Sequence, residues 1–115
     1  MEVNMKLNKA ILINPSELSV TEITVPNHYT SIQDVIGCRC FTCVRINEKN
    51  VAYCDDEGLL NGTEYGTTFV EYVYPESIAG KILILGDDGQ GGSCDTFLSV
   101  RDVQKIISCF VQFQH

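Results

Sequence analysis

The sequence predicts an α+β fold in which an antiparallel sheet carries a short central helix and a C-terminal helix on one of its faces. Short runs of apolar and β-branched residues recur along the chain, and turn-forming residues separate them. Two segments, residues 27–37 and 98–113, have apolar residues at helical spacing. The expected order is strand, strand, helix, strand, strand, irregular segment, strand, helix, within a single domain over residues 1–115.

The first two strands should form a hairpin. Residues 9–15 (KAILINP) are an apolar run that ends at Pro15. Residues 17–26 (ELSVTEITVP) are rich in β-branched side chains and end at Pro26. The residues that join the two runs have the composition of a tight turn, so we expect an antiparallel pair at the N-terminus.

Residues 27–37 (NHYTSIQDVIG) predict the short central helix. Thr30 or Ser31 can cap its first turn, and Gly37 can end it in a left-handed conformation. The apolar stripe that should face the sheet consists of Ile32, Val35 and Ile36.

The middle of the chain predicts three more strands. Residues 40–46 (CFTCVRI) should pair with residues 51–58 (VAYCDDEG), and residues 80–86 (GKILILG) have the composition of a buried strand. Residues 59–68 are loop-like, with glycines as punctuation, and residues 67–76 fit neither the helical nor the strand period well.

The last segment, residues 98–113, predicts the C-terminal helix. Ser99 can cap it, and Asp102 lies in its first turn. The apolar residues on one helical face are Val103, Ile106, Ile107 and Phe110.

Three of the six cysteines fall within residues 38–43, in the pattern C-x-C-x-x-C. A structural zinc site needs four ligands, usually in two pairs, and no second pair at that spacing follows. On a strand, Cys40 and Cys43 would also point to opposite faces. A catalytic thiol would need a neighbouring base, and disulfides are rare in reducing compartments. The pattern therefore favours small buried side chains at Cys38, Cys40, Cys54 and Cys109.

The chain is acidic, with a net charge of −7 and a pI near 4.6. An acidic surface disfavours binding to a DNA or RNA polymer, but it leaves room for one local basic pocket. The apolar runs are too short for a signal peptide or a membrane span, so we expect a cytoplasmic protein with reduced thiols.

Two motifs could hold a metal ion or a phosphate. Residues 54–58 (CDDEG) lack the alternating oxygen ligands of a calcium loop and fit a solvated turn. Residues 86–92 (GDDGQGG) lack the G-K-[ST] of a phosphate loop, and their aspartates would repel phosphate. This second motif fits a hairpin tip, with a loop that covers a ligand as the alternative. We therefore predict neither a metal site nor a cofactor.

The basic residues offer an anion site. Arg101 and Lys105 lie four positions apart, which places them on one face of a helix, as solvated surface residues or as a phosphate clamp. With two arginines of residues 39–45 they make up half of the eight basic residues. An aromatic ring nearby could stack a base, although rings are more often core. The candidate ligand-binding residues are Arg101, Lys105, Arg39, Arg45, Tyr74 and Phe97.

Residues 10–90 resemble a family of small phage and mobile-element proteins that share a domain of unknown function. The family pattern is an N-terminal hairpin, I-x-x-x-V-G-G, a hydrophobic strand, a D-E-x-G turn and I-x-G before a last strand. The matching segments here are residues 32–37, 56–58 and 78–80. Cys38 stands where the family has its second glycine, which weakens any catalytic role for this thiol. The resemblance implies the fold and says little about chemistry.

Residues 98–106 (LSVRDVQKI) are similar to the C-terminal helix of phage anti-Thoeris sponge proteins. Those proteins are β-rich oligomers that sequester cyclic ADP-ribose signals, and some relatives hold cyclic oligonucleotides. The resemblance implies a phage-type counter-defence protein that binds a small phosphorylated nucleotide signal without cleaving it. It also implies a homo-oligomer in the host cytoplasm, with Arg101 and Lys105 as the phosphate-gripping pair.

Three other functions remain open. An acidic protein-interaction inhibitor could mimic nucleic acid and block a basic surface of a host factor. An enzyme that degrades the same signals would need His28 or the acids of residues 55–57 beside the ligand. A structural accessory domain is also compatible with the sequence. Because the chain shows no convincing pair of nucleophile and base, binding is favoured over turnover.

Overall fold

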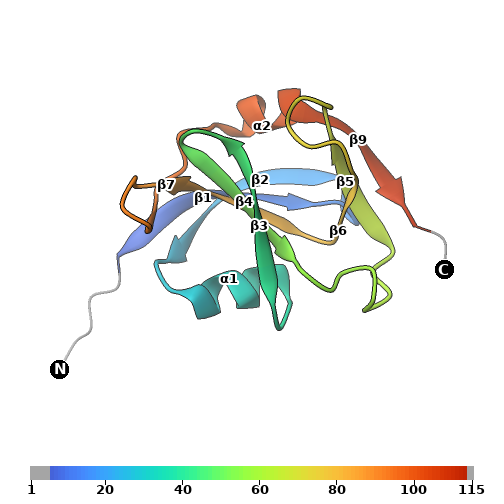
Figure 1. The fold of residues 1–115 in the computed structure, drawn as a ribbon, viewed down its shortest axis with the longest axis horizontal. Helices are drawn as coiled ribbons and strands as arrows, with labels where there is room; N and C mark the ends of the chain where they lie inside the picture. The colour runs from blue at the N-terminus through green and yellow to red at the C-terminus, as the bar shows by residue number, and fades with distance from the viewer. Residues whose placement is uncertain (1–5, 114–115) are drawn as a thin grey trace.

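The computed structural model describes residues 6–113, which form two antiparallel sheets and two helices (Figure 1). The α+β class predicted from the sequence is therefore confirmed. The elements, in chain order, are β1 (Leu7–Asn14), β2 (Ser19–Pro26), α1 (Tyr29–Ile36), β3 (Phe41–Asn47), β4 (Asn50–Asp55), β5 (Tyr65–Phe69), β6 (Ile78–Ala79), β7 (Ile82–Asp87), β8 (Ser93–Cys94), α2 (Val100–Ile106) and β9 (Ile107–Gln112).

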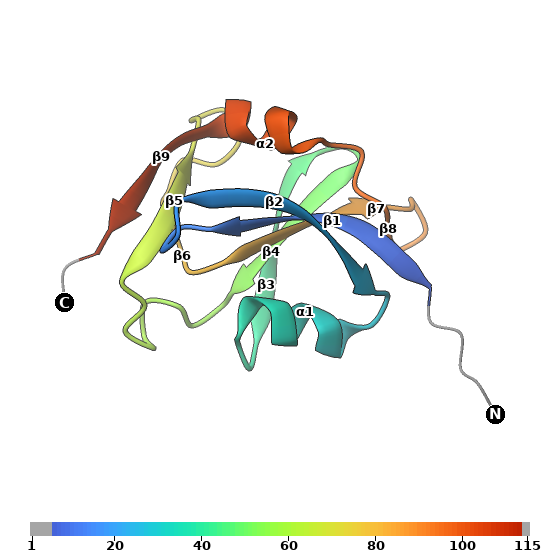
Figure 2. The same ribbon diagram turned by 180° about the vertical axis from the view of Figure 1, so that it is seen from behind.

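The larger sheet is the centre of the molecule. Its strands run in the order β2-β1-β7-β4-β3, with β8 paired to β7, and the smaller sheet has the order β6-β5-β9. Helix α1 packs on one face of the larger sheet, which we call the α1 face. The smaller sheet and α2 pack on the opposite face, as the two views of the ribbon show (Figures 1 and 2).

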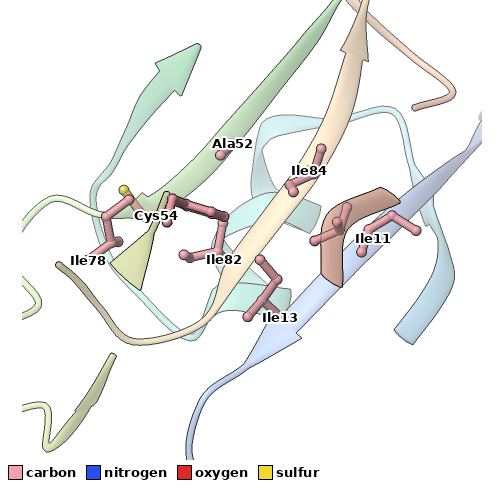
Figure 3. Close-up of a cluster of buried hydrophobic side chains, with 9 residues drawn as sticks. Ile11, Ile13, Ala52, Cys54, Ile78, Ile82 and Ile84 are labelled. Atoms are coloured by element: carbon pink, nitrogen blue, oxygen red, sulfur yellow. The ribbon is translucent and has the colours of Figure 1, made fainter. Parts of the chain in front are cut away.

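The prediction that both helices cover one face is wrong. The strands of the larger sheet are apolar on both faces, so each face needs a cover. Along β7, Ile82 and Ile84 join the core shared with the smaller sheet, whereas Leu83 and Leu85 join the core under α1. Figure 3 shows the first of these cores, with isoleucines of β1 and β7 beside Ala52 and Cys54 of β4.

The N-terminal hairpin and the central helix form as predicted. Strands β1 and β2 pair from Leu7 opposite Pro26 to Asn14 opposite Ser19. Helix α1 ends at Gly37, whose φ of 77° is the left-handed conformation expected of a terminal glycine. The cap differs from the prediction, because the His28 ring, rather than Thr30 or Ser31, accepts the hydrogen bond from the first turn.

The predicted C-terminal helix is correct only in its first half. Ser99 caps α2 as expected, but the helix ends at Ile106, and residues 107–112 form strand β9. The segment alternates Ile, Cys and Val with Ser, Phe and Gln, which suits a strand as well as a helix. Strand β9 supplies the hydrogen bonds that the edge of β5 needs, from Tyr65 opposite Gln112 to Phe69 opposite Ile107.

Strand β5 itself lies partly in the predicted loop over residues 59–68. The sequence predicts that Gly66 lies in a loop, but the residue lies inside the strand. A glycine is needed there because neighbouring atoms come close to its Cα. A Cβ at this position would come within 2.5 Å of the Ile78 carbonyl oxygen and 2.6 Å of the Phe113 ring. A glycine can therefore mark tight packing between neighbouring strands as well as a turn.

None of the helices in residues 6–113 combines the length and the apolar character that crossing a membrane would need.

Candidate functional site

One concave surface of the described chain lies where the β3–β4 turn meets the segment before α2. It is shallow, with a volume of about 410 Å³. Figures 1 and 2 both show the chain running from β8 to α2 alongside this turn. We call the surface the Phe97 shelf, and its lining residues are Asn47, Glu48, Lys49, Asn50, Phe97 and Leu98.

A buried asparagine holds the shelf together. The Asn50 side chain, only 1% exposed, accepts hydrogen bonds at its Oδ1 from the Thr96 hydroxyl (2.8 Å) and from the Phe97 backbone N–H (2.9 Å). Its amide group donates to Oδ1 of Asn47 at 3.0 Å. Thr96 is buried as well, and its Oγ1 accepts from the backbone N–H of Leu98. These bonds satisfy polar groups at the junction and fix the backbone that carries Phe97.

The Phe97 ring is 58% exposed, although a phenyl ring has no polar atom that favours solvent. The ammonium Nζ of Lys49 lies 5.3 Å from the ring centroid, within the range of a cation–π contact. An exposed ring beside a cation can stack a planar base on one side and attract an anionic group on the other. The geometry thus supports recognition of a flat, negatively charged ligand.

Helix α2 follows the shelf directly in the chain. Its capping box consists of the Ser99 hydroxyl, which accepts from Asp102 N–H, and the Asp102 carboxylate, which accepts from Ser99 N–H at 2.9 Å. The hydrogen bonds from Ser99 keep the pKa of Asp102 below its ordinary value. Arg101 and Lys105 are exposed, and neither forms an ion pair within residues 6–113. Both cations lie on α2, four and eight residues after Phe97, and Lys105 already interacts electrostatically with the Asp102 carboxylate.

Arg45 lies at the same end of the molecule, but its guanidinium is already engaged. It forms a 2.7 Å ion pair with Asp87, and it also donates to the backbone carbonyls of Asn47 and Glu48. The hydrogen bond from Arg45 is the main cause of the lowered pKa of Asp87. Arg45 therefore stabilises the β3–β4 turn through its hydrogen bonds to the Asn47 and Glu48 carbonyls. A ligand anion would have to compete with Asp87 for the guanidinium.

The other two predicted residues lie elsewhere. Arg39 is beyond the C-terminus of α1, at the far end of β3 from the shelf, and pairs with Glu57 at 3.2 Å. Tyr74 is half-buried, packs against the core between the two sheets and lines an acidic groove with Glu57. The structure thus places Phe97 and Arg45 beside the β3–β4 turn and the two basic residues 101 and 105 on α2, the helix that follows. Arg39 and Tyr74 lie apart from the shelf.

The sequence interpretation missed Lys49 and Asn50. Both belong to a polar segment that reads as a turn, because nothing local distinguishes a buried asparagine from an exposed one. The local signal is only that asparagine side chains readily hydrogen-bond to nearby backbone groups at turns, which does not indicate the distant partners Thr96 and Phe97.

The glycine-rich hairpin between β7 and β8 is not a phosphate cradle. Oδ1 of Asp87 accepts from the N–H of Gly89, and Oδ1 of Asp88 accepts from the N–H groups of Gln90 and Gly92. The two aspartates therefore occupy the amides that a phosphate loop would leave free. This agrees with the expectation that these residues form a hairpin tip.

The cysteines divide into buried and exposed groups. Cys54 is buried, and burial is the main reason that its pKa rises to about 11. The prediction of burial is wrong for Cys40 and Cys109, which are exposed, as is Cys43. Cys40 precedes β3, Cys43 lies in β3 at the edge of the larger sheet, and Cys109 lies in β9 at the edge of the smaller sheet, where fewer neighbours cover a side chain. In the part of the chain that the structure describes, no three His, Cys, Asp or Glu side chains are arranged to hold a metal ion.

Comparisons with known proteins give the family. The family model described as "Domain of unknown function (DUF3846)" matches residues 5–111. The uncharacterized protein y4iR of Sinorhizobium fredii is 26% identical over 104 residues, which cover 89% of this chain and 63% of the relative. This chain therefore spans less than two thirds of that relative's length. No solved structure matches the chain. With nearly its whole length matched by the model, the chain belongs to the DUF3846 family, as its resemblance to a domain of unknown function predicted.

Proposed function

We propose that the protein binds and sequesters a small phosphorylated nucleotide signal, such as cyclic ADP-ribose or a cyclic oligonucleotide, without cleaving it. The base stacks on Phe97, and the phosphates meet Lys49, Arg101 and Lys105. The observation that carries the proposal is the Phe97 shelf, where an exposed ring lies 5.3 Å from an ammonium group.

Preorganisation supports this assignment. The Asn50 hydrogen bonds hold the backbone of Phe97 in place before any ligand arrives. An ordered backbone lowers the conformational entropy that the segment loses on binding, and base stacking contributes about 1–3 kcal/mol per base. The exposed cations of α2 add attraction for phosphate on an otherwise acidic surface.

The lining of the shelf favours holding a ligand over cleaving it. Its six residues include no serine, cysteine or histidine, the side chains that most often act as nucleophiles or general bases. Glu48 is its one carboxylate. In this proposal the protein works in the cytoplasm as a homo-oligomer, in the counter-defence role that the resemblance to phage sponge proteins implies.

The test is a thermal-shift screen against cyclic ADP-ribose isomers, cyclic di- and trinucleotides, NAD and ADP-ribose. Bound ligand is then released by heat and identified by HPLC. We expect a higher Tm with one ligand class and recovery of that ligand intact. Altered ligand would mean an enzyme, and the absence of a shift with every nucleotide would refute the proposal.

Variants locate the binding site. Phe97→Ala should reduce affinity about tenfold or more, because it removes the stacking surface. Tyr72→Ala is the matched control, since Tyr72 is 85% exposed and lies outside the shelf. Lys49→Gln should weaken binding of a phosphorylated ligand, while Lys9→Gln, on an exposed position of β1, should not.

A second candidate function, the acidic protein-interaction inhibitor, is favoured by the groove that contains Tyr74. This groove, of about 270 Å³, is lined by Asp55, Asp56, Glu57 and Glu76 together with the exposed Leu59 and Leu60. Carboxylates beside exposed apolar side chains suit a basic segment that also presents an apolar residue.

Fluorescence anisotropy with a labelled lysine-rich, leucine-containing peptide tests this second candidate. Affinity should fall steeply as salt rises, and Asp56→Asn with Glu76→Gln should weaken it more than Glu17→Gln, an exposed site on the β1–β2 turn. Equal binding by all variants would argue against the groove.

A further inference from the structure

A pocket at the C-terminal end of α1, away from the Phe97 shelf, has the features of a ligand site. It has a volume of about 220 Å³ and is formed by five segments: the β1–β2 turn, the end of α1, the end of β4, the start of β5 and the turn before β7. Pockets for drug-sized ligands are larger, about 300–1,000 Å³, so this one suits a small metabolite. We propose that it binds a free α-amino acid as its zwitterion.

The floor of the pocket is a polar row across three neighbouring strands. Ile82 of β7 pairs with Ile13 on one side and Cys54 on the other. Continued by one residue, this register places Lys81 between Asn14 and Asp55, and all three line the pocket. Two residues further along each strand, the next row on the α1 face consists of Leu12, Leu83 and Tyr53, which pack in the core under the helix. Because α1 ends at Ile36, the polar row faces the pocket rather than a helix.

Lys81 is half-buried without a counter-ion. The ion pairs within residues 6–113 are Arg39–Glu57 and Arg45–Asp87, so Lys81 forms none, although Asp55 is its cross-strand neighbour. Asp55 is turned toward its own turn, where its Oδ1 accepts from the N–H of Glu57 at 2.9 Å. A ligand carboxylate would give this unpaired ammonium group a charge-assisted hydrogen bond.

Asn14 can bind the same ligand carboxylate. Its Oδ1 already accepts a 2.8 Å hydrogen bond from the Ser16 hydroxyl. That bond orients the side-chain amide and leaves its NH₂ group as a donor toward the pocket. Lys81 and Asn14 thus provide two adjacent donors for the two oxygens of one carboxylate.

Other lining residues suit an amine. Glu64 also lines the pocket, and its carboxylate has no partner among the residues described. The last carbonyl groups of α1 carry partial negative charge at the helix C-terminus, which favours a cation. Asp55 and Glu64 disfavour a purely anionic ligand, and Lys81 disfavours a purely cationic one. A zwitterion has a charge for each kind of group in the lining, and Pro15, Ile36 and Tyr65 offer apolar contact for a small side chain.

The experiment is a thermal-shift screen of the full chain with the twenty free amino acids, followed by calorimetry on the best. Each hit is compared with its amide, which lacks the carboxylate, and with its N-acetyl form, which lacks the amine. We expect an amino acid to raise the Tm, and both blocked forms to bind at least about tenfold more weakly, because each loses a charge-assisted bond.

Variants place the binding at this pocket. Lys81→Gln and Glu64→Gln should each weaken binding about tenfold or more, whereas Lys9→Gln should leave it unchanged. Amide NMR shifts on titration should centre on Gly37, Tyr65 and Gly80, which line the pocket. Circular dichroism checks that each variant is folded. Absence of a shift with every amino acid, or equal binding by Lys81→Gln and the native chain, would overturn the proposal.

Discussion

Replacing Asn50 with alanine should destabilise the protein more than its small size suggests. The substitution removes three hydrogen bonds, those from the Thr96 hydroxyl, from Phe97 N–H and to Asn47 Oδ1. Each such bond contributes about 0.5–1.5 kcal/mol, and a donor left unsatisfied in the interior costs about 1–3 kcal/mol. Because Thr96 is buried, its hydroxyl cannot turn to solvent. We therefore expect the free energy of unfolding to fall by about 3 kcal/mol.

Urea denaturation followed by circular dichroism measures this loss directly. For a chain of 115 residues, a change of about 3 kcal/mol corresponds to a decrease in Tm of roughly 10 °C. Asn27→Ala is the matched control. Its amide donates one 3.3 Å hydrogen bond to the Ser93 carbonyl at an exposed position, so the change should stay within about 0.5 kcal/mol.

A loss below about 1 kcal/mol for Asn50→Ala would refute the reasoning. It would mean that water satisfies Thr96 and Phe97 once the asparagine is gone, and that the junction before α2 is open rather than packed. The same result would remove the argument that the Phe97 ring is held ready for a ligand.

Three further predictions concern single side chains. At pH 8, Ellman's reagent should react with the exposed thiols of Cys40, Cys43 and Cys109 well before it reacts with Cys54, whose pKa is about 11. Equal reaction rates for all the thiols would contradict the burial of Cys54. Ser99→Ala should cost about 1 kcal/mol of unfolding free energy, because it removes the cap of α2; an unchanged urea midpoint would show that the cap contributes nothing. The pKa of Asp102 is lower in the folded state than in the unfolded chain, where it is about 3.9. The hydrogen bonds to its carboxylate therefore stabilise the protein fully above pH about 3.9. This stabilisation is lost as the pH falls through the pKa of the folded state. Asp102→Asn should therefore flatten the loss of stability in acid, measured by urea midpoints between pH 2 and 6, whereas Asp34→Asn on the exposed side of α1 should not.

Much of the fold follows from local patterns. Proline and β-branched residues define the β1–β2 hairpin, and a terminal glycine defines the end of α1. The same is true of the Ser99 cap, whose capping box uses only residues three apart. Each of these features depends on neighbours in the chain, so the sequence contains all the information that the feature needs.

Only part of the candidate site could be predicted from the sequence. Arg101 and Lys105 could be named because their spacing is a property of one helix. Lys49 and Asn50 could not, because their roles depend on a segment almost fifty residues away, which reaches them through the pairing of β4 with β7 and of β7 with β8. Arg39 and Tyr74 were named for their chemistry, and their distance from the shelf is a consequence of the same pairing.

Amino-acid sequence alone determined the α+β class, the hairpin, the end of α1, the start of α2 and the acidic character of this protein. Tertiary structure decided what residues 107–112 become, since a segment that suits both a helix and a strand takes the form that gives β5 a partner. It also decided which side chains are exposed, as with Cys40, and which polar groups meet, as with Asn50 and Phe97. The physical reason is common to all three cases: burial and long-range hydrogen bonds belong to pairs of distant segments, and local preferences are too weak to specify them.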